Sequence, residues 1–549
     1  MITVIVIAAV ACGGVWLLYR YITQPTVDGT AKTVPSSRDV VLNIAYTPEK
    51  EQLFRELVRR FAATNPRTTT GKRIVAEASS METEAMIEAA LAGKLDAVSP
   101  DSSIWLTQLD TAWQAQQQTD VSLIGDTVRF AVSPVTIAMW EDVARRLGYP
   151  DTSIGWQEIM NLARSDSGFR WSHPATTSSS GLLAALAMFY AGAGKTRGLT
   201  QQDVEAEATT AYVSAVEKTV RYYGEGEMAI IQRALQEGPG FLDAFVVPER
   251  LVVYYNQQGR GSKLVAIYPR EGTLWQDHPL ALLEHATLSN EQRQAFTVLR
   301  DFFLSADSQR YVLQLGYRPA DLSIPLDGPD SPITPANGVD PAEPQTTLQI
   351  PSPGVIEVVR QAWQYTKRHA NIILVADVSG SMQGAKLAQA QAAMLTFLEQ
   401  IPGDIERVGL ISFASSVQEV VPLAAMGDNR GRLQSAIRNL AARGNTALLD
   451  ATQRAYAQLQ ALNDAERINA VVVMTDGKEN NSRITLSQLT QQVSAGNQRG
   501  VQVIIFCVAY GDDADMNMLR AIADTSGGLA RYGDPESIKE LYKILSTYF

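Results

Sequence analysis

The chain opens with an apolar run that carries no charged side chain from residue 2 to residue 19. A helix of this length is about long enough to cross the hydrocarbon core of a bilayer. No Lys/Arg region precedes the run and no Ala-x-Ala site follows it, which disfavours a cleaved signal peptide. A lipoprotein site at Cys12 is also disfavoured, because apolar residues continue through Leu18. The pattern therefore predicts an uncleaved transmembrane anchor over residues 1–24 and a polar spacer over 25–39.

From residue 40 onward, short apolar runs alternate with amphipathic helical patterns. Residues 40–46 predict a strand, and residues 50–63 predict a helix whose apolar positions recur on one face. Strand–turn–helix patterns repeat over 74–91 and again from residue 95. This order is typical of a parallel sheet, in which ligand contacts gather in the loops at the carboxyl ends of the strands.

A proline-rich stretch interrupts this pattern. Eight prolines lie between residues 325 and 353, a density that neither a helix nor a central strand tolerates. We expect a semi-rigid linker or an irregular wrap over 321–354 that separates two globular parts. These parts are residues 40–320 and 355–549, and the second begins with a helical pattern before a new strand–helix alternation starts at Asn371.

Three loops of the second part carry oxygen-rich motifs. Its first strand ends in Asp377-Val378-Ser379-Gly380-Ser381, Thr446 precedes a helix, and Asp476 follows another apolar strand. All three loops should open on the same edge of a parallel sheet. Hydroxyl and carboxylate oxygens suit a hard divalent cation such as Mg2+, which takes six oxygen ligands. We expect Ser379, Ser381 and Thr446 to bind the ion directly, with Asp377 and Asp476 holding its coordinating waters.

This motif set resembles the von Willebrand factor type A (VWA) domain with its metal-ion-dependent adhesion site, over about Asn371 to Phe549. The match is complete at all five oxygen-bearing positions. The resemblance implies a doubly wound, Rossmann-like fold, with Mg2+ or Mn2+ bridging to an acidic residue of a protein partner. The alternative is that the two serines only cap a helix and that Asp476-Gly477 is an ordinary turn.

A run of hydroxyls in the first part, Thr176 to Ser180, leads directly into a helical pattern. Free backbone N–H groups at a helix N-terminus favour anions, so a small anion or polar solute would fit there. Plain N-capping by one serine is the alternative.

Residues 40 to about 320 resemble a bacterial extracellular solute-binding protein of the two-lobed, periplasmic-binding-protein-like kind. The resemblance is carried by the opening strand with its Tyr46-Thr47 loop, loops at 79–80 and 101–103, a crossover-like run at 133–139, the hydroxyl run, and strands expected at 252–256 and 266–268. It implies an α/β fold with two lobes that close on a ligand. The lobes would be residues 40–132 plus 265–320, and residues 133–264.

Hydroxyl groups would provide much of the binding in such a module, because its loops show no basic cluster. The expected ligand-binding residues are Tyr46, Thr47, Ser79, Ser80, Ser102, Ser103, Thr177, Ser178, Ser179 and Tyr254.

Composition excludes several classes of function. A net charge of -11 without a basic tract argues against a nucleic-acid partner, because phosphate binding needs clustered Lys and Arg. Two cysteines and four scattered histidines exclude a Cys/His zinc cluster and leave few candidate general bases. We expect no catalytic residues and a protein that is not an enzyme.

These features together predict a single-pass protein of the cell membrane with an extracytoplasmic body, which binds a protein partner and could bind a small solute. One observation conflicts: Arg20 after the apolar run favours a cytoplasmic body. The runner-up is a metal-site-bearing docking subunit of a cytoplasmic ATPase or chelatase-type complex, as some bacterial relatives of the VWA domain are. A hydrolase is disfavoured because no nucleophile, base and orienting group occur as a set.

Overall fold

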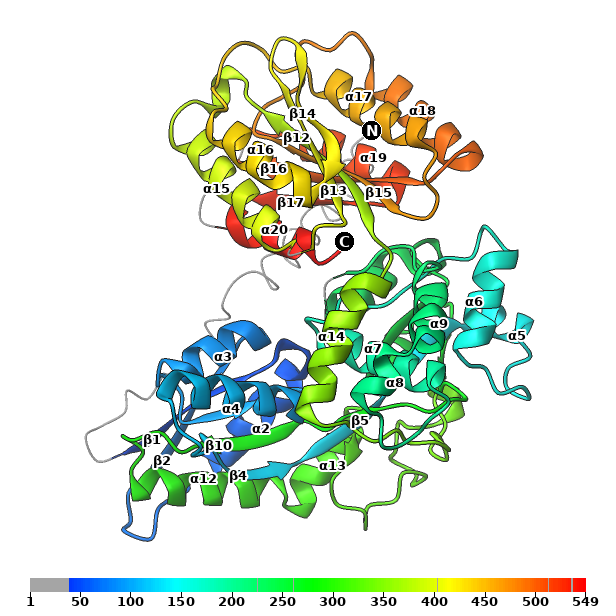
Figure 1. Ribbon diagram of the computed structural model, residues 1–549. Coiled ribbons are helices and arrows are strands. Elements are labelled where there is room, and N and C mark those ends of the chain that lie inside the picture. The colour runs from blue at the N-terminus through cyan, green and yellow to red at the C-terminus, as the bar shows by residue number, and fades with distance from the viewer. Residues whose placement is uncertain (1–38, 225, 260, 402, 512, 535–536) are drawn as a thin grey trace, which may run out of the picture.

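The computed structural model describes residues 39–224, 226–259, 261–401, 403–511, 513–534 and 537–549. They form two α/β lobes and a C-terminal α/β domain, which lies above the lobes in Figure 1. The predicted membrane anchor over 1–24 lies outside the described residues. Among the helices of the described ranges, none combines the length and the apolar character needed to cross a membrane.

Lobe one is built on a five-stranded sheet in the order β2-β1-β3-β10-β4. Its strands are β1 (Val40–Tyr46), β2 (Ile74–Ser80), β3 (Ala97–Ser99), β4 (Ile124–Arg129) and β10 (Pro279–Leu283). Its helices are η1 (Pro48–Lys50), α2 (Glu51–Ala63), α3 (Thr83–Leu91), α4 (Ser103–Gln117), α12 (Asn290–Phe303) and α13 (Ala306–Gln314). The expected apolar face of α2 is buried through Leu53, Phe54, Leu57 and Phe61. Strand β1 pairs in parallel with β2 and β3, as predicted, whereas β10 is antiparallel to β3 and β4.

Lobe two is built around the long strand β5. Its sheet has the order β11-β5-β7-β6, with β8 and β9 also paired to β5. The strands are β5 (Ala131–Trp140), β6 (Trp171–Ser172), β7 (Ala244–Pro248), β8 (Leu264–Ile267), β9 (Trp275–Gln276) and β11 (Arg318–Pro319). The helices are α5 (Glu141–Arg146), α6 (Trp156–Ser165), α7 (Ser179–Gly192), α8 (Gln201–Glu205), α9 (Glu207–Glu217), α10 (Glu227–Glu237), η2 (Gly238–Gly240) and α11 (Glu249–Gln257).

Two sequence predictions for the lobes are wrong. The chain returns to lobe one between β9 and β10, not at residue 265, because β8 and β9 pair with β5. The run 252–256, predicted as a strand, lies in helix α11. Leu251, Val252 and Val253 of α11 are buried, and a short buried apolar run cannot be assigned to strand or helix by periodicity alone.

The proline-rich segment is a wrap on lobe two. Leu348 donates its N–H to the carbonyl of Thr273, and Ala266 donates to the carbonyl of Gly338. Gly338 follows the short helix η3 (Pro335–Asn337) with φ +76, and a Cβ there would lie 2.0 Å from the Leu264 carbonyl oxygen. Only glycine fits at this close approach, which fixes the segment against β8.

Helix α14 (Pro353–Thr366) connects the wrap to the C-terminal domain. The sequence pattern places it in that domain, but the helix packs against α7, α8 and α9 of lobe two. It also reaches lobe one, where Arg360 donates to Gln108 Oε1 of α4 at 3.0 Å. Figure 1 shows α14 running alongside lobe two below the C-terminal domain. The apolar face of α14 packs against the lobes, so it is not available to cover the C-terminal sheet.

The C-terminal domain is doubly wound, as predicted. Its sheet has the order β14-β13-β12-β15-β16-β17 and is parallel except for β14. The strands are β12 (Ala370–Asp377), β13 (Arg407–Phe413), β14 (Val417–Ala425), β15 (Ile468–Thr475), β16 (Val503–Tyr510) and β17 (Leu529–Gly533). The helices are η4 (Gly380–Met382), α15 (Ala385–Glu399), α16 (Met426–Arg438), α17 (Leu448–Leu462), α18 (Leu486–Arg499), α19 (Met516–Ser526) and α20 (Ile538–Ser546).

Alternate residues of the central strand face two separate cores. Ile372 and Leu374 belong to the core that includes α15 and α20, whereas Ile373 and Val375 belong to the core of α17, α18 and α19. A strand covered on both faces needs a continuous apolar sequence, and β12 is buried along its whole length.

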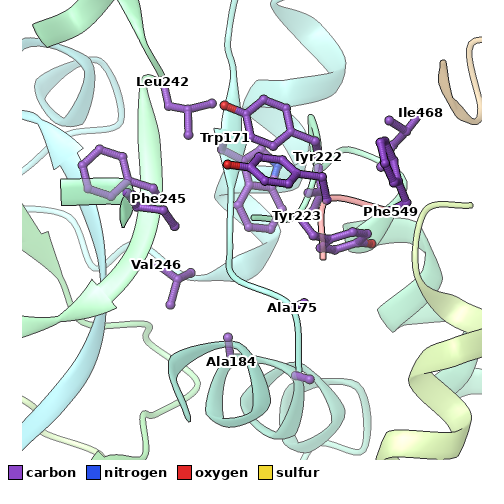
Figure 2. Packing of buried hydrophobic residues seen from close by; sticks show 14 of the residues in the cluster. Trp171, Ala175, Ala184, Tyr222, Tyr223, Leu242, Phe245, Val246, Ile468 and Phe549 are labelled. Carbon is purple, nitrogen blue, oxygen red and sulfur yellow. The ribbon is translucent and has the colours of Figure 1, made fainter. Parts of the chain in front are cut away.

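A buried joint fixes the C-terminal domain to lobe two. Figure 2 shows Tyr222 and Tyr223 of lobe two in the same apolar cluster as Phe549 of the C-terminal domain. The ring of Tyr222 lies 5.5 Å from that of Tyr548, and the Tyr223 N–H donates to the Tyr548 carbonyl at 3.3 Å. The fully buried Glu217 carboxylate accepts hydrogen bonds from the indole of Trp363 at 2.8 Å and the hydroxyl of Tyr223 at 2.7 Å. Burying a carboxylate without such partners would cost several kcal/mol, so these donors stabilise the attachment of α14 to lobe two beside the joint. Across the joint itself, Arg233 of lobe two donates to the carbonyl of Gly528 at 3.2 Å.

Candidate functional site

The predicted metal site lies where β12 and β15 end. The two strands pair in parallel with Ala376 opposite Met474, so Asp377 and Asp476 emerge at the same edge of the sheet. The loop before α17 is brought to this edge by the hydrogen bond from the Gly380 N–H to the Gly444 carbonyl, at 2.9 Å. The structure therefore brings together all three loops that the sequence motifs selected.

Asp377 is held at both carboxylate oxygens. Its Oδ1 accepts the backbone N–H of Ser379 at 2.7 Å, and its Oδ2 accepts the hydroxyl of Thr475 at 2.5 Å. Burial raises the pKa of Asp377 above its ordinary value, and the hydrogen bonds from Thr475 and Ser379 partly offset that effect. A buried carboxylate with both oxygens fixed is a positioned negative charge.

The serine hydroxyls form a chain to the second carboxylate. Ser379 Oγ and Ser381 Oγ lie 3.0 Å apart, and Ser381 donates to Asp476 Oδ1 at 2.7 Å. The other oxygen of Asp476 accepts a hydrogen bond from Lys386 Nζ at 2.6 Å. Asp476 is fully buried, so its charge is directed at these two partners.

Thr446 completes the cluster from the third loop. Its backbone N–H donates to Asn480 Oδ1 at 2.9 Å, which ties it to the loop after Asp476. A Cβ on Gly477 would lie 3.4 Å from both Ser381 Oγ and Thr446 Oγ1. The two hydroxyls therefore flank the same backbone position.

The donor set fits a hard divalent cation. Three hydroxyls and two carboxylates converge, and oxygen ligands of this kind are those that Mg2+ and Mn2+ prefer. Within the described ranges, no group of three or more His, Cys, Asp or Glu side chains could hold a metal. The fit therefore depends on the serine and threonine hydroxyls.

Sequence reasoning missed two residues at this site. Thr475 directly precedes Asp476 and anchors Asp377, and Lys386 lies in the first turn of α15 with its ammonium on Asp476. Thr475 is the end of an otherwise apolar strand, so its polarity was a usable signal. The reach of Lys386 to a loop 90 residues away could not be read from the chain.

The predicted solute-binding hydroxyls divide into two groups. Ser179 lies at the junction of the lobes, where it donates to Asp101 Oδ1 at 2.5 Å and accepts from the indole of Trp105 at 2.5 Å. Ser102 and Ser178 are the N-caps of α4 and α7, so for Ser178 the structure shows the N-capping that was the alternative for the hydroxyl run. Ser103 donates its backbone N–H to Asp277 at 2.7 Å.

The other predicted hydroxyls are not brought together. Tyr46 donates to Glu51 at 2.7 Å, and Thr47 donates to Glu49 at 2.7 Å, both within lobe one. Ser79 and Ser80 belong to strand β2 and are exposed, as is Thr177. Tyr254 lines a cavity of about 100 Å³ between the lobes, together with Glu49, Arg250 and Tyr317 among others.

Charged residues that the sequence did not reveal fill the junction of the lobes. The fully buried Lys50 donates to the carbonyl of Pro100 at 2.5 Å, and Arg250 of α11 donates to the carbonyl of Glu49. Across the junction, Glu227 accepts the backbone N–H of Ser180 at 2.8 Å and the amide of Gln276 at 2.9 Å. Chain-distant charges thus meet where a two-lobed module would hold a ligand.

Some polar atoms at this junction have no hydrogen-bond partner among the described residues. These are both ring nitrogens of the fully buried His278, Gln276 Oε1 and Arg250 Nε. Burial lowers the pKa of His278 well below its ordinary value, and the charges of Lys50 and Arg250 act in the same direction. The closed junction therefore contains unused hydrogen-bonding capacity.

Comparison with known families identifies both parts of the chain. The model of the family described as bacterial extracellular solute-binding protein matches residues 42–318. The model of the von Willebrand factor type A domain matches residues 371–544. The two resemblances found in the sequence are therefore confirmed, in the same order along the chain.

Individual relatives match parts of the chain. Inter-alpha-trypsin inhibitor heavy chain H4 of Sus scrofa is 29% identical over 178 residues, which are 31% of this chain and 19% of that protein. The chain thus spans about a fifth of the length of this relative. The sulfate-binding protein SubI of Mycobacterium tuberculosis is 18% identical, with a TM-score of 0.37 over 52% of this chain and 88% of that one. A von Willebrand factor type A structure from Catenulispora acidiphila is 21% identical, with a TM-score of 0.29 over 33% of this chain and 43% of that one.

Asp101 gives the junction a pH dependence that can be measured. Burial raises its pKa well above the ordinary value, as do the carboxylates of Glu49 and Glu227. The stabilising contribution of its protonated form is complete below the ordinary carboxyl pKa and is lost as the pH rises through the raised value. An asparagine at this position cannot ionise, so Asp101→Asn should raise the apparent Tm at pH 8 by about 2–4 °C and change it little at pH 4.

Thermal unfolding at pH 4, 6 and 8 tests this, with Asp120→Asn, an exposed carboxylate of the same lobe, as the control. An Asp101→Asn variant that is less stable than wild type at pH 8 would show that the charge of Asp101 holds the junction together.

Proposed function

Because the chain belongs to the bacterial extracellular solute-binding protein family and carries a von Willebrand factor type A domain after that module, we propose that it is a membrane-anchored, extracytoplasmic binding protein. Its VWA domain would bind a protein partner through a metal ion, and its two-lobed module would bind a small solute or act as a scaffold. The observation that carries the proposal is the convergence of five oxygen-bearing side chains from three loops at one sheet edge.

The residues of this edge have distinct tasks in the proposal. Ser379, Ser381 and Thr446 would supply neutral hydroxyl ligands, while Asp377 and Asp476 would hold coordinating waters and compensate charge. A bound Mg2+ or Mn2+ would supply an electrophilic centre that accepts a carboxylate from the partner. Asp377 is suited to its task because Thr475 and the Ser379 N–H fix both its oxygens.

The non-enzymatic part of the proposal rests on the chemistry of both sites. The two matching families are binding modules, and the metal edge offers hydroxyls and carboxylates without a histidine. At the lobe junction, the pKa of His278 is lowered and both its ring nitrogens are buried, so it is poorly placed to accept a proton from a solute.

The two-lobed module is closed by its own side chains. Ser179 joins Asp101 and Trp105 across the lobes, and Arg250 reaches the backbone of Glu49. A solute would therefore compete with these internal bonds and would have to use the unpartnered groups of Gln276 and Arg250. If no solute does so, the module remains a rigid support for the VWA domain.

Metal binding can be tested at Asp377. We expect Asp377→Ala to weaken Mn2+ binding at least a hundred-fold, because it removes a buried charge and frees Ser379 and Thr475 from their fixed positions. Isothermal titration calorimetry of the full chain in detergent measures the affinity, and circular dichroism checks that the fold is kept.

The matched control is Asp513→Ala, which removes an exposed carboxylate from the loop after β16. Undiminished Mn2+ binding in Asp377→Ala, or an equal loss in Asp513→Ala, would refute the assignment of the site.

The location of the body decides between the proposal and its runner-up, a docking subunit of a cytoplasmic ATPase or chelatase-type complex. We expect β-lactamase or alkaline phosphatase, fused after residue 30, to be active when expressed in bacteria. Alkaline phosphatase activity, or ampicillin resistance from the β-lactamase fusion, places the body outside the cytoplasm, because the phosphatase becomes active and the lactamase protects the cell only after export. Silence of both, with the fusion present on an immunoblot, would favour the runner-up.

A further inference from the structure

A lysine lies against the predicted metal site. Lys386 Nζ is 2.6 Å from Asp476 Oδ2, while Asp476 Oδ1 accepts the hydroxyl of Ser381. The carboxylate is therefore shared between a fixed cation and one of the expected metal-binding hydroxyls. The Asp476 side chain is fully buried and the Lys386 side chain is 35% exposed, so water only partly screens this ion pair.

The position of Lys386 is unfavourable for its helix. It is the second residue of α15, and a cation in the first turn opposes the helix dipole. The first turn of α15 also has no acidic residue that would offset this effect. The salt bridge to Asp476 offsets this unfavourable position. Lys386 therefore stabilises the site and not its own helix.

The formal charge of the site differs by one unit with and without this lysine. Asp377 and Asp476 give a formal charge of -2, and the ammonium of Lys386 brings it to -1. A divalent ion would then leave the loaded site at +1, whereas without the lysine the loaded site would be neutral. A loaded site with a net charge of +1 attracts an anion to its open position. In a loaded site with no net charge, only direct coordination to the ion would favour the anion.

We propose that Lys386 sets the charge of the metal site, so that it weakens the hold on the divalent cation and strengthens the capture of a carboxylate by the loaded site. This inference rests on the proposed metal-dependent function and identifies the residue that tunes it. Lys386 does not need to touch the partner, because its effect is carried by the field across Asp476. Opposite effects on the affinity for the cation and the affinity for the anion are expected only if Lys386 sets the charge of the site.

Calorimetric titration of the full chain with Mn2+ tests whether Lys386 weakens binding of the cation. Lys386→Gln keeps a hydrogen-bond donor for Asp476 but removes the charge, and should tighten Mn2+ binding on the order of ten-fold. Lys386→Arg keeps the charge and should bind Mn2+ like wild type. The control is Lys478→Gln, which removes an exposed cation two residues after Asp476 and should change the affinity much less.

Acetate, added to the protein saturated with Mn2+, tests whether Lys386 strengthens the capture of a carboxylate, by its effect on the electron paramagnetic resonance spectrum of the ion. Lys386→Gln should weaken acetate binding several-fold while Lys386→Arg keeps it. Weaker or unchanged Mn2+ binding in Lys386→Gln overturns the inference, as does an equal gain in Lys478→Gln. If Lys386 were merely structural, its replacement by Gln would lower the affinities for Mn2+ and for acetate together.

The outcome for wild type separates the two proposals. If wild type binds no Mn2+ but Lys386→Gln does, the metal-dependent function fails for the natural chain, and of the inference only the weakening of cation binding by Lys386 holds. If neither binds Mn2+, both fail. If wild type binds Mn2+ and Lys386→Gln binds it no more tightly, only the inference fails.

Discussion

The parallel register of β12 with its two neighbours is the constraint on which the C-terminal domain depends. Pairing with β13 places Asp377 opposite Phe413, and pairing with β15 places the turn of Asp476 beside it. A shift of one residue would send the buried side chains of β12 to the wrong core and turn Asp377 away from Ser379 and Thr475. The apolar alternation of the strand thus fixes the fold and the oxygen cluster together.

The joint with lobe two acts at the opposite end of the same strand. Arg368, two residues before β12, donates its backbone N–H to Tyr223 of lobe two, and Lys367 donates to the C-terminal carbonyl of Phe549. Asp377 lies seven residues beyond Ala370, or roughly 23 Å along an extended strand. The domain is therefore held at one edge of its sheet, and the oxygen cluster is left at the edge away from the joint.

The sequence predicted the C-terminal domain well because its signals are local. The strands β12, β13, β15 and β16 are apolar runs that end in polar turns, whereas the outer strands β14 and β17 are not. Asp377, Ser379 and Ser381 lie within five residues. The lobes were harder to predict, since the short apolar run around Val252 and Val253 is buried and is compatible with a strand or a helix. The cap serines Ser102 and Ser178 also look like ligand groups until their hydrogen bonds are seen.

The groups that could not be predicted are those that depend on distant contacts. Lys50, Arg250 and Glu227 carry no motif, and only the closure of the lobes brings them together. No sequence motif marks Lys386 either, because a lysine in a helix is usually solvated. The same holds for α14, whose apolar face fits either domain until its packing against lobe two is known.

The central claim is that hydroxyls and carboxylates from three loops form one cation site. The most direct test is a crystal of the full chain grown with Mn2+, with diffraction data collected near the manganese absorption edge. The account predicts an anomalous peak about 2.1–2.3 Å from the hydroxyl oxygens of Ser379, Ser381 and Thr446, with Asp377 and Asp476 one water further away. Manganese bound elsewhere on the chain, with no peak at this edge of the sheet, would contradict it.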